Sequence, residues 1–259
     1  MTTAVAVRQP FSTTMVVLAV VSAVAWVVTL TWAQSSNMGA MPGTMGMNVV
    51  TFIAMWALMM TAMMLPSVGP FVGVYQRTVT EHRAIRLPAL ALGYLAVWAA
   101  VGVAAYIVAD WFGGLADGNA HAAQVVAVAT FATVGVFQLS PFKFRCLSHC
   151  RTPLGHLIHY LGYRGPLRDV RAGASHGWFC LGCCWALMVL MIAFGVMNVG
   201  AMIGLAVVIA VEKVWRHGER FARVIGVAAL VYAAALVFMP ELAPGLDPGA
   251  VSTMTDMGM

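Results

Sequence analysis

The chain of 259 residues is dominated by long apolar runs that are separated by short polar connections. Seven runs approach the ~20 residues needed to cross the hydrocarbon of a bilayer. They cover 14–32, 49–68, 90–109, 125–141, 177–196, 199–215 and 223–239. Runs of this length do not suit the alternating strands of a membrane barrel. The pattern predicts an all-α protein, a polytopic bundle of about seven transmembrane helices that forms one transmembrane domain over residues 1–259.

Charged residues are scarce, and their distribution predicts an orientation. Hydrophobic residues make up 61% of the chain and charged residues only 9%, whereas a soluble domain carries about 25% charged residues. All 14 Lys and Arg residues fall on alternate connections, and the other side carries only acids such as Asp110 and Glu241. The positive-inside rule then places the N-terminus inside and the C-terminus outside, in a bacterial cytoplasmic (inner) membrane. The net charge of +5 therefore indicates topology and contact with anionic lipid rather than nucleic-acid binding.

Three connections differ from the others in composition. A Met-rich outside loop covers 34–48, a cytoplasmic loop with cysteine and histidine covers 142–176, and a Met-containing outside tail covers 241–259. Leucine and isoleucine at helical spacing within 153–163 predict a short helix at the membrane interface. Pro66 and Pro70 predict that the second helix kinks or ends near its cytoplasmic mouth.

All five cysteines of the chain occur in two clusters. One is Cys146-Leu-Ser-His-Cys150, and the other is Cys180-Leu-Gly-Cys-Cys-Trp185. A spacing of four residues places the outer cysteines of each cluster on one helical face. We expect the clusters to meet at the inner mouth of the bundle, with Cys183 as a fifth or exchanging ligand. The candidate metal ligands are Cys146, Cys150, Cys180, Cys183, Cys184, His149 and His176.

Thiolates together with imidazole select soft or borderline metals, which here means copper(I) or zinc. Lys143 and Arg145 flank Cys146 and are expected to favour its thiolate. Two alternatives stay open. The cysteines could be small, soft packing residues, or two of them could form a redox pair with Cα atoms under about 7 Å apart. A structural disulfide is disfavoured because thiols stay reduced in the cytoplasm.

Methionine is unusually abundant, at 19 residues. Thioether sulfur suits Cu(I) in an oxidising space where thiols would be consumed. Possible secondary thioether sites lie in the outside loop and along one face of the second helix, at Met38, Met41, Met45, Met47, Met55, Met59 and Met63. The alternatives are a flexible surface loop and a packing seam lined with methionine.

The remaining polar residues predict no catalysis. The sequence has no Gly-rich phosphate loop, no Ser/His/Asp arrangement and no paired intramembrane carboxylates, so neither an ATP-driven pump nor a hydrolase is indicated. We expect Glu212 and Lys213 to pair with each other at the interface, and Gln138 to hydrogen-bond across helices. Asn198 is expected to serve a tight turn.

Several motifs in a fixed order carry a resemblance to a known family. They are Ala62-Met-Met-Leu-Pro-Ser67, Ser140-Pro-Phe-Lys-Phe-Arg-Cys-Leu-Ser-His-Cys-Arg-Thr-Pro153, Cys180-Leu-Gly-Cys-Cys-Trp-Ala-Leu-Met188, Met197-Asn198 and Glu212-Lys213. Over about residues 48–240 the chain resembles a bacterial family described as predicted metal-binding integral membrane proteins, a domain of unknown function. The resemblance implies a multi-helix membrane fold and a metal site, and no established reaction.

Two hypotheses about function follow. The first is a membrane protein that binds a soft metal, copper(I) first and zinc second, for metal acquisition, transfer or assembly of a membrane metalloenzyme. The second is an accessory structural subunit of a larger membrane oxidase or monooxygenase complex, with a purely structural metal. The expected partners are the lipid bilayer and other membrane subunits or a metal-dependent membrane enzyme, without nucleic acid.

Overall fold

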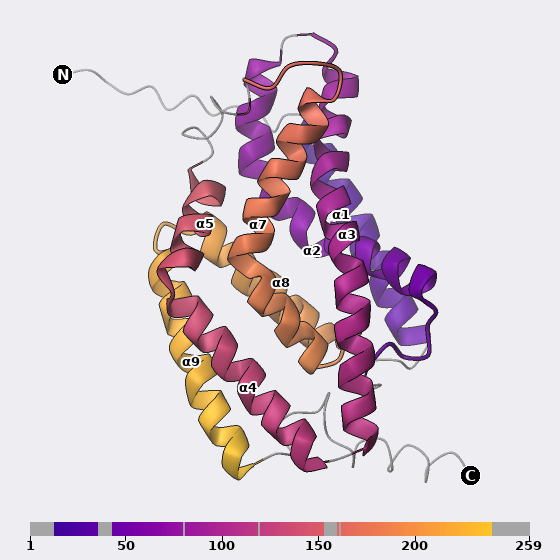
Figure 1. Cartoon of the computed structure of the whole chain (residues 1–259). Helices are drawn as coiled ribbons and strands as arrows, with labels where there is room; N and C mark the ends of the chain where they lie inside the picture. Colours follow the sequence, from indigo (N-terminus) through magenta and orange to yellow (C-terminus); the bar gives the residue numbers. More distant parts are fainter. Residues whose placement is uncertain are drawn as a thin grey trace, which may run out of the picture.

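The computed structural model describes residues 13–35, 43–79, 81–118, 120–152, 160 and 162–239, and the regular structure within them is entirely helical (Figure 1). The helices are α1 (Thr13–Ser35), α2 (Val49–Thr78), α3 (Arg83–Gly118), α4 (Ala120–Leu139), α5 (Pro141–Arg151), α7 (Arg168–Ala193), α8 (Val199–Val214) and α9 (Gly218–Phe238). The prediction of an all-α protein is confirmed.

Five of these helices, α1, α2, α3, α7 and α9, are long and apolar enough to cross a membrane. Helices α4 and α5 pass the same test only as a pair, and the pair bends by 62° between Leu139 and Pro141. Each of the seven predicted runs overlaps a helix, but α8 has 16 residues and falls short of the ~20 that a span needs. The structure therefore supports five spans, or six if the bent pair counts as one.

Helix α2 continues to Thr78 through both of its prolines. Of the kink or end expected there, the end near Pro66 is therefore wrong, and the kink stays a prediction. Proline at position 66 cannot donate a backbone hydrogen bond to the carbonyl of Ala62. The hydroxyl of Ser22 on α1 donates to that carbonyl instead, at 2.8 Å. A freed carbonyl that finds a partner on a neighbouring helix lets a membrane helix tolerate proline, and it also docks α1 onto α2.

Side-chain caps explain where three helices begin. The side chains of Asn48 and Asn198 accept hydrogen bonds from the backbone N–H groups of Thr51 and Ala201, each at 3.0 Å. Ser140 accepts from the N–H of Lys143 and is followed by Pro141 at the first helical position of α5. This combination starts a new helix, so the chain turns sharply after α4. The expected turn role of Asn198 is confirmed.

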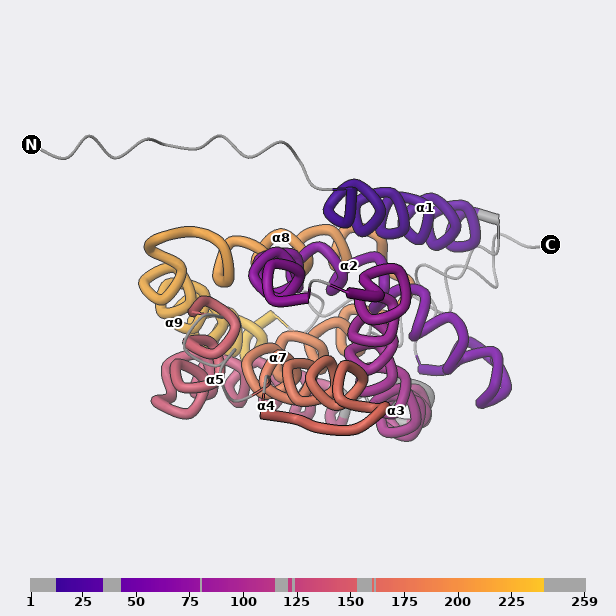
Figure 2. Tube along the Cα trace, turned by 90° about the horizontal axis from the view of Figure 1, so that it is seen from above, coloured from indigo at the N-terminus to yellow at the C-terminus, as the bar shows by residue number. Residues whose placement is uncertain are grey.

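Helices α2 and α7 form the centre of the bundle. In α7, 67% of the apolar stretch is buried, and in α2 50%, compared with 17% in α1. Figure 2 shows α1 at the edge of the bundle, with α2 between it and α7. Helix α3 packs along α7 and helix α4 along α9, as Figure 1 also shows.

Glycines allow the backbones of α3 and α7 to touch. A Cβ atom at Gly173 would lie 2.8 Å from the carbonyl carbon of Leu90 and closer still to its oxygen. A Cβ atom at Gly93 would likewise overlap the carbonyl of Val170 on α7. Small residues at the crossing of two membrane helices permit this close approach, and here it fixes the position of α7 against α3.

A buried ionic contact ties the ends of α2, α3 and α7 together. The guanidinium of Arg86 binds the carboxylate of Asp169 at 3.0 Å, and the hydroxyl of Tyr75 donates to the same carboxylate at 2.5 Å. The α2–α3 connection and the start of α7, both rich in basic residues, therefore lie at one end of the bundle, while its orientation in a membrane stays a prediction. The tail 241–259, residues 36–42 of the loop 34–48 and most of the expected interface helix in 153–163 lie outside the described residues.

Candidate metal centre

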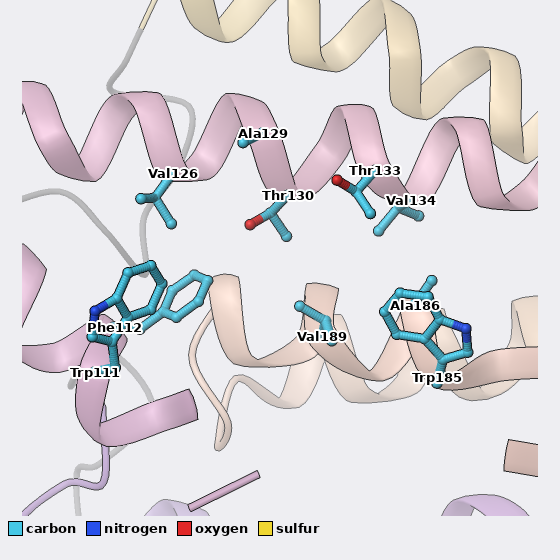
Figure 3. A pocket seen from close by; sticks show the side chains of 10 residues that line it. All are labelled: Trp111, Phe112, Val126, Ala129, Thr130, Thr133, Val134, Trp185, Ala186 and Val189. Carbon is cyan, nitrogen blue, oxygen red and sulfur yellow. The ribbon is translucent and has the colours of Figure 1, made fainter. Parts of the chain in front are cut away.

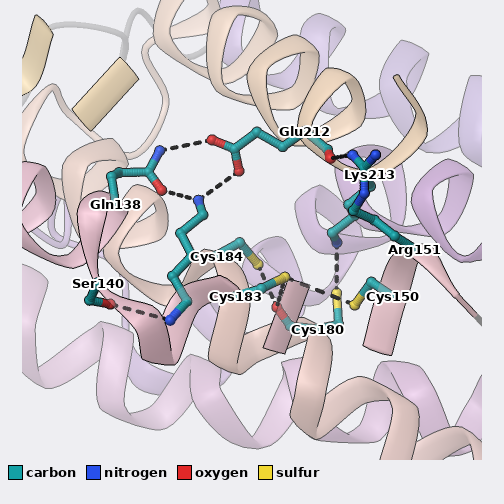
Figure 4. A network of polar contacts seen from close by, with 10 residues as sticks. Gln138, Ser140, Cys150, Arg151, Cys180, Cys183, Cys184, Glu212 and Lys213 are labelled. Atoms are coloured by element: carbon teal, nitrogen blue, oxygen red, sulfur yellow. Dashed lines mark hydrogen bonds and ion pairs between the residues drawn. The ribbon is translucent and has the colours of Figure 1, made fainter. Parts of the chain in front are cut away.

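Helix α5, which carries the first cysteine cluster, is held at its start by three buried polar side chains. Lys143 donates to the carboxylate of Glu212 on α8 at 2.6 Å and also to the amide oxygen of Gln138 on α4. Gln138 in turn donates to Glu212 at 2.8 Å (Figure 4). None of the three is more than 2% exposed. The expectation that Gln138 hydrogen-bonds across helices is confirmed.

The end of α5 is fixed to the same neighbour. The guanidinium of Arg151 donates to the backbone carbonyls of Glu212 at 2.6 Å and Arg216 at 3.0 Å, where a cation stabilises the C-terminal end of α8. Gly218 leaves room for this side chain, since a Cβ atom there would overlap the guanidinium. Held at both ends, α5 presents its cysteines to α7 at a defined angle. The expected long loop over 142–176 therefore contains helix α5 and the first turns of α7.

The two cysteine clusters meet between α5 and α7. The sulfur of Cys150 lies 3.9 Å from the sulfur of Cys183, although the two residues are 33 positions apart. Figure 4 shows these side chains converging with Cys180 and Cys184 on one small region. The expectation that the clusters come within about 4 Å of each other is met by this pair. The pairing uses Cys183, however, and not the Cys184 that spacing alone favours.

A lysine lies directly beside these thiols. The ammonium group of Lys213 on α8 is 2.9 Å from the sulfur of Cys180 and 3.2 Å from the hydroxyl of Ser67 on α2. The hydroxyl of Tyr94 on α3 approaches the same sulfur at 3.0 Å. Within the described part of the chain, Lys213 has no ion pair with a carboxylate. A positive charge at this distance stabilises negative charge on sulfur.

The expected pairing of Glu212 with Lys213 is therefore wrong. Neighbouring residues of a helix point about 100° apart, and each of these two faces a different part of the bundle. Glu212 binds Lys143, and Lys213 binds the thiol of Cys180. The ammonium group of Lys143 binds Glu212 and Gln138 and so does not act on Cys146 as expected. Lys213 places a positive charge beside Cys180 instead, and the effect of Arg145 on Cys146 stays a prediction.

The other thiols differ in their contacts. The sulfurs of Cys183 and Cys184 each donate to the backbone carbonyl of Cys180, at 3.0 and 2.9 Å. Cys146 packs against Gly182, where a Cβ atom would lie 2.9 Å from its sulfur. All five cysteines are buried and free of disulfides.

The two histidines take up aromatic contacts beside the thiols. The ring of His149 stacks on Phe179 at 4.0 Å, and its Nδ1 lies 2.9 Å from the carbonyl oxygen of Arg145. His176 is buried one turn before Cys180 and stacks on Phe71 at 4.1 Å. Neither contact tests a role as ligand, which stays a prediction.

Tyr160 lies over the same region from the following connection. Its ring packs edge-on against Phe71, with ring centroids 5.4 Å apart. Burial first, and then the neighbouring Cys150, raise the pKa of Tyr160. The phenol therefore stays neutral and packs as an apolar ring near Cys150.

The arrangement suits an ion that accepts few ligands. Among the described residues, no three His, Cys, Asp or Glu side chains converge closely enough to enclose an ion. A metal–sulfur bond of about 2.3 Å allows two sulfurs on one ion to lie up to about 4.6 Å apart. The 3.9 Å between Cys150 and Cys183 fits such a bridge. Structural zinc prefers four ligands, and this geometry does not provide them.

The methionines of the second helix lie inside the bundle. Met55, Met59 and Met63 are each at most 4% exposed. The carbonyl of Met64 accepts a hydrogen bond from Ser67 at 2.7 Å, so this stripe ends beside Lys213 and Cys180. Met47 is also buried and Met45 is half-buried, whereas Met38 and Met41 lie outside the described residues. A role of this stripe as a set of thioether ligands stays a prediction.

An apolar cavity of about 250 Å³ between α3, α4 and α7 is a poor candidate for the site. Figure 3 shows Val126, Ala129 and Thr130 of α4 facing Val189 of α7, with tryptophans at either side. Among the described residues that line it, only Thr130 and Thr133 carry hydroxyl groups, and none is a cysteine, histidine or methionine. Its chemistry suits an acyl chain or another apolar group better than a metal.

Three residues of this centre were not singled out as ligands or neighbours by sequence reasoning. Tyr94 and Ser67 are isolated polar groups inside apolar runs, which is the signal that could have found them. Lys213 was noticed, but its partner was assigned from its sequence neighbour. Which thiol it faces depends on the rotation of α8, and helical spacing alone does not specify that rotation.

Comparison with known families agrees with this chemistry. The sequence model of one family, PpoB2, described as a copper chaperone, matches residues 53–236, well over half of the chain. The matched residues fall within the stretch that resembles the metal-binding membrane family. No curated protein sequence and no solved structure matches the chain.

Proposed function

The chain belongs to the PpoB2 family of copper chaperones, and from this premise we propose that it holds one Cu(I) ion between α5 and α7 for delivery to a metalloenzyme. The observation that carries the proposal is the approach of Cys150 to Cys183 across two helices, at 3.9 Å, inside an apolar bundle. Soft thiolate sulfur is the ligand type that selects Cu(I). The role is carriage and transfer of the ion rather than catalysis.

The proposed ligand set follows the observed contacts. Cys150 on α5 and Cys183 on α7 form the inner pair. Cys180 and Cys184 lie on the same turn of α7 as Cys183. Lys213 supplies one positive charge that offsets part of the negative charge of the thiolates. Copper is favoured over zinc because the family is copper-related and because the described residues do not gather four ligands.

We propose that the protein acts within the bacterial inner membrane. Five helices of sufficient length and apolar character support a multi-pass membrane protein. Arg151 at the end of α5 and Lys213 at the end of α8 lie in the thiol region, and the positive-inside rule assigns connections with such basic residues to the cytoplasm. Cu(I) would then be held near the side on which thiols stay reduced.

The proposed orientation makes a prediction about reporters. A reporter fused after Met259 should behave as exported, and one inserted just before Arg168 should behave as cytoplasmic, because the basic residues segregate to one side. Alkaline phosphatase and fluorescent-protein fusions, assayed in intact cells, measure both positions. A cytoplasmic C-terminus would contradict the orientation without affecting the thiol site.

Replacing the inner pair tests the copper site. Cys150→Ser and Cys183→Ser should each lower the affinity for Cu(I) at least about tenfold, because each removes one of two close sulfur ligands. Metal analysis of protein purified under reducing conditions, with a Cu(I) chelator as competitor, measures the effect. Met188→Leu is the matched control, since Met188 is buried on the next turn of α7 and should keep its copper. Full copper content in the double cysteine variant would contradict the proposal.

An accessory structural subunit of a membrane oxidase or monooxygenase is the second candidate. It is favoured by large aromatic side chains exposed on α7, namely Trp178 at 67% and Trp185 at 36%, which suit contact with another membrane protein. Copper added to the medium separates the two functions. Added copper should restore the activity of a copper enzyme in cells that lack its chaperone. It should not restore that activity in cells that lack a structural subunit of the enzyme.

A further inference from the structure

One thiol of the five stands apart from the others. The sulfur of Cys146 rests against Gly182, where a Cβ atom would lie 2.9 Å away. Within the described part of the chain, no hydrogen bond involves this thiol, whereas the other four thiols each have at least one. Cys146 thus lies next to the inner pair without belonging to it.

The position of Cys146 is nevertheless close to both members of the inner pair. It precedes Cys150 by one turn of α5, a rise of about 6 Å, on the same helical face. It also rests on the residue that directly precedes Cys183 in the chain. An ion held by the inner pair would therefore lie near a third sulfur, that of Cys146.

Gly182, which contacts Cys146, also lines a cavity. The cavity has a volume of about 480 Å³, lies between α2, α3, α5 and α7, and is also lined by Trp178, Trp185 and Phe142. Phe142 precedes Cys146 by one turn of α5. Cys146 and Cys150, at 8% and 6%, are also the more exposed thiols, whereas Cys180, Cys183 and Cys184 are each 1% exposed.

We propose that Cys146 is the exchange ligand through which Cu(I) enters and leaves the inner pair, and that Gly182 keeps the space for it. The inference rests on the proposed copper function. In the step, a bond forms between copper and the Cys146 sulfur, the bond to the Cys150 sulfur breaks, and Cys183 stays bound. Cys146 gives up its thiol proton and the released Cys150 sulfur takes up a proton. Copper remains Cu(I), so no electron is transferred.

Transfer kinetics test this role. Full-length protein in detergent, reduced and loaded with one equivalent of Cu(I), is mixed with excess bathocuproine disulfonate, and formation of the coloured complex is followed with time. Cys146→Ser should keep one equivalent of Cu(I) at equilibrium but release it at least tenfold more slowly. Gly182→Ala should slow release in the same direction, because its Cβ displaces the Cys146 sulfur. Gly204→Ala is the matched control, since nothing lies within 4 Å of its Cβ.

The possible results distinguish failure of the exchange role from failure of the proposed copper function. Release from both Cys146→Ser and Cys146→Ala at the wild-type rate would overturn the exchange role. Loss of bound copper in Cys146→Ser, with an unchanged elution profile, would make Cys146 an inner ligand and would also overturn it. If wild-type protein bound no Cu(I), the proposed function itself would fail. If only Cys150→Ser and Cys183→Ser behaved as expected, the proposed function would stand and the exchange role would not.

Discussion

A Lys143→Met variant should lose about 3–5 kcal/mol of its free energy of unfolding, because it leaves a buried carboxylate without its counter-charge. Lys143 is fully buried, and the carboxylate of Glu212, its ion-pair partner, is 2% exposed. Among the described residues, only Gln138 would remain as a donor to that carboxylate, and it is neutral. For a chain of this size the loss corresponds to roughly 2–4 °C per kcal/mol, which thermal melting in detergent measures.

The double variant Lys143→Met, Glu212→Leu separates the charge effect from loss of packing. Replacing both members of a buried ion pair by apolar residues is often neutral, so the double variant should recover much of the lost stability. Arg220→Met is the control for removal of a positive charge, because Arg220 is exposed on α9. A single variant as stable as the wild type would mean that Lys143 does not pair with Glu212 inside the bundle.

The apolar runs predicted the helices well because burial in lipid requires long apolar segments whose backbone is hydrogen-bonded internally. Their ends were harder to predict. Helix α2 extends to Thr78 and helix α3 to Gly118, well past the predicted apolar runs. Helix α8 is too short for a span. These differences arise because caps, and a carbonyl partner such as Ser22, decide where a helix ends.

Which thiols meet could not be predicted from the sequence, for a different reason. Spacing placed Cys146 with Cys150 and Cys180 with Cys184 on common faces, and that reasoning about single helices was sound. The rotation of α5 against α7 then decided which thiols meet. That rotation is set by Gly182 at the contact and by the two attachments of α5 to α8, through Lys143 and Arg151. None of these contacts follows from the pattern within one helix.

A Gly173→Ala variant should force α3 away from α7 and lower the free energy of unfolding by about 3 kcal/mol or more, at or beyond the upper end of ordinary overpacking. The new Cβ would overlap the backbone carbonyl of Leu90 and lie 3.0 Å from the backbone nitrogen of Tyr94. Backbone atoms of a packed helix cannot rotate away as the end of a side chain can. Thermal melting in detergent measures the loss of stability.

The same substitution connects helix packing to the copper site. Tyr94 is carried by α3, and its hydroxyl lies 3.0 Å from the sulfur of Cys180 on α7, so separating the helices should also weaken Cu(I) binding.

A graded series of glycine substitutions supplies the control. Gly204→Ala adds a Cβ in open space, Gly177→Ala places one 3.2 Å from the carbonyl oxygen of Tyr94, and Gly173→Ala produces the overlap. Stability and copper affinity should fall in that order, because the close approach of α3 and α7 holds Tyr94 against the thiol. Equal melting temperatures for Gly173→Ala and Gly204→Ala would show that the two backbones are not in contact at this crossing.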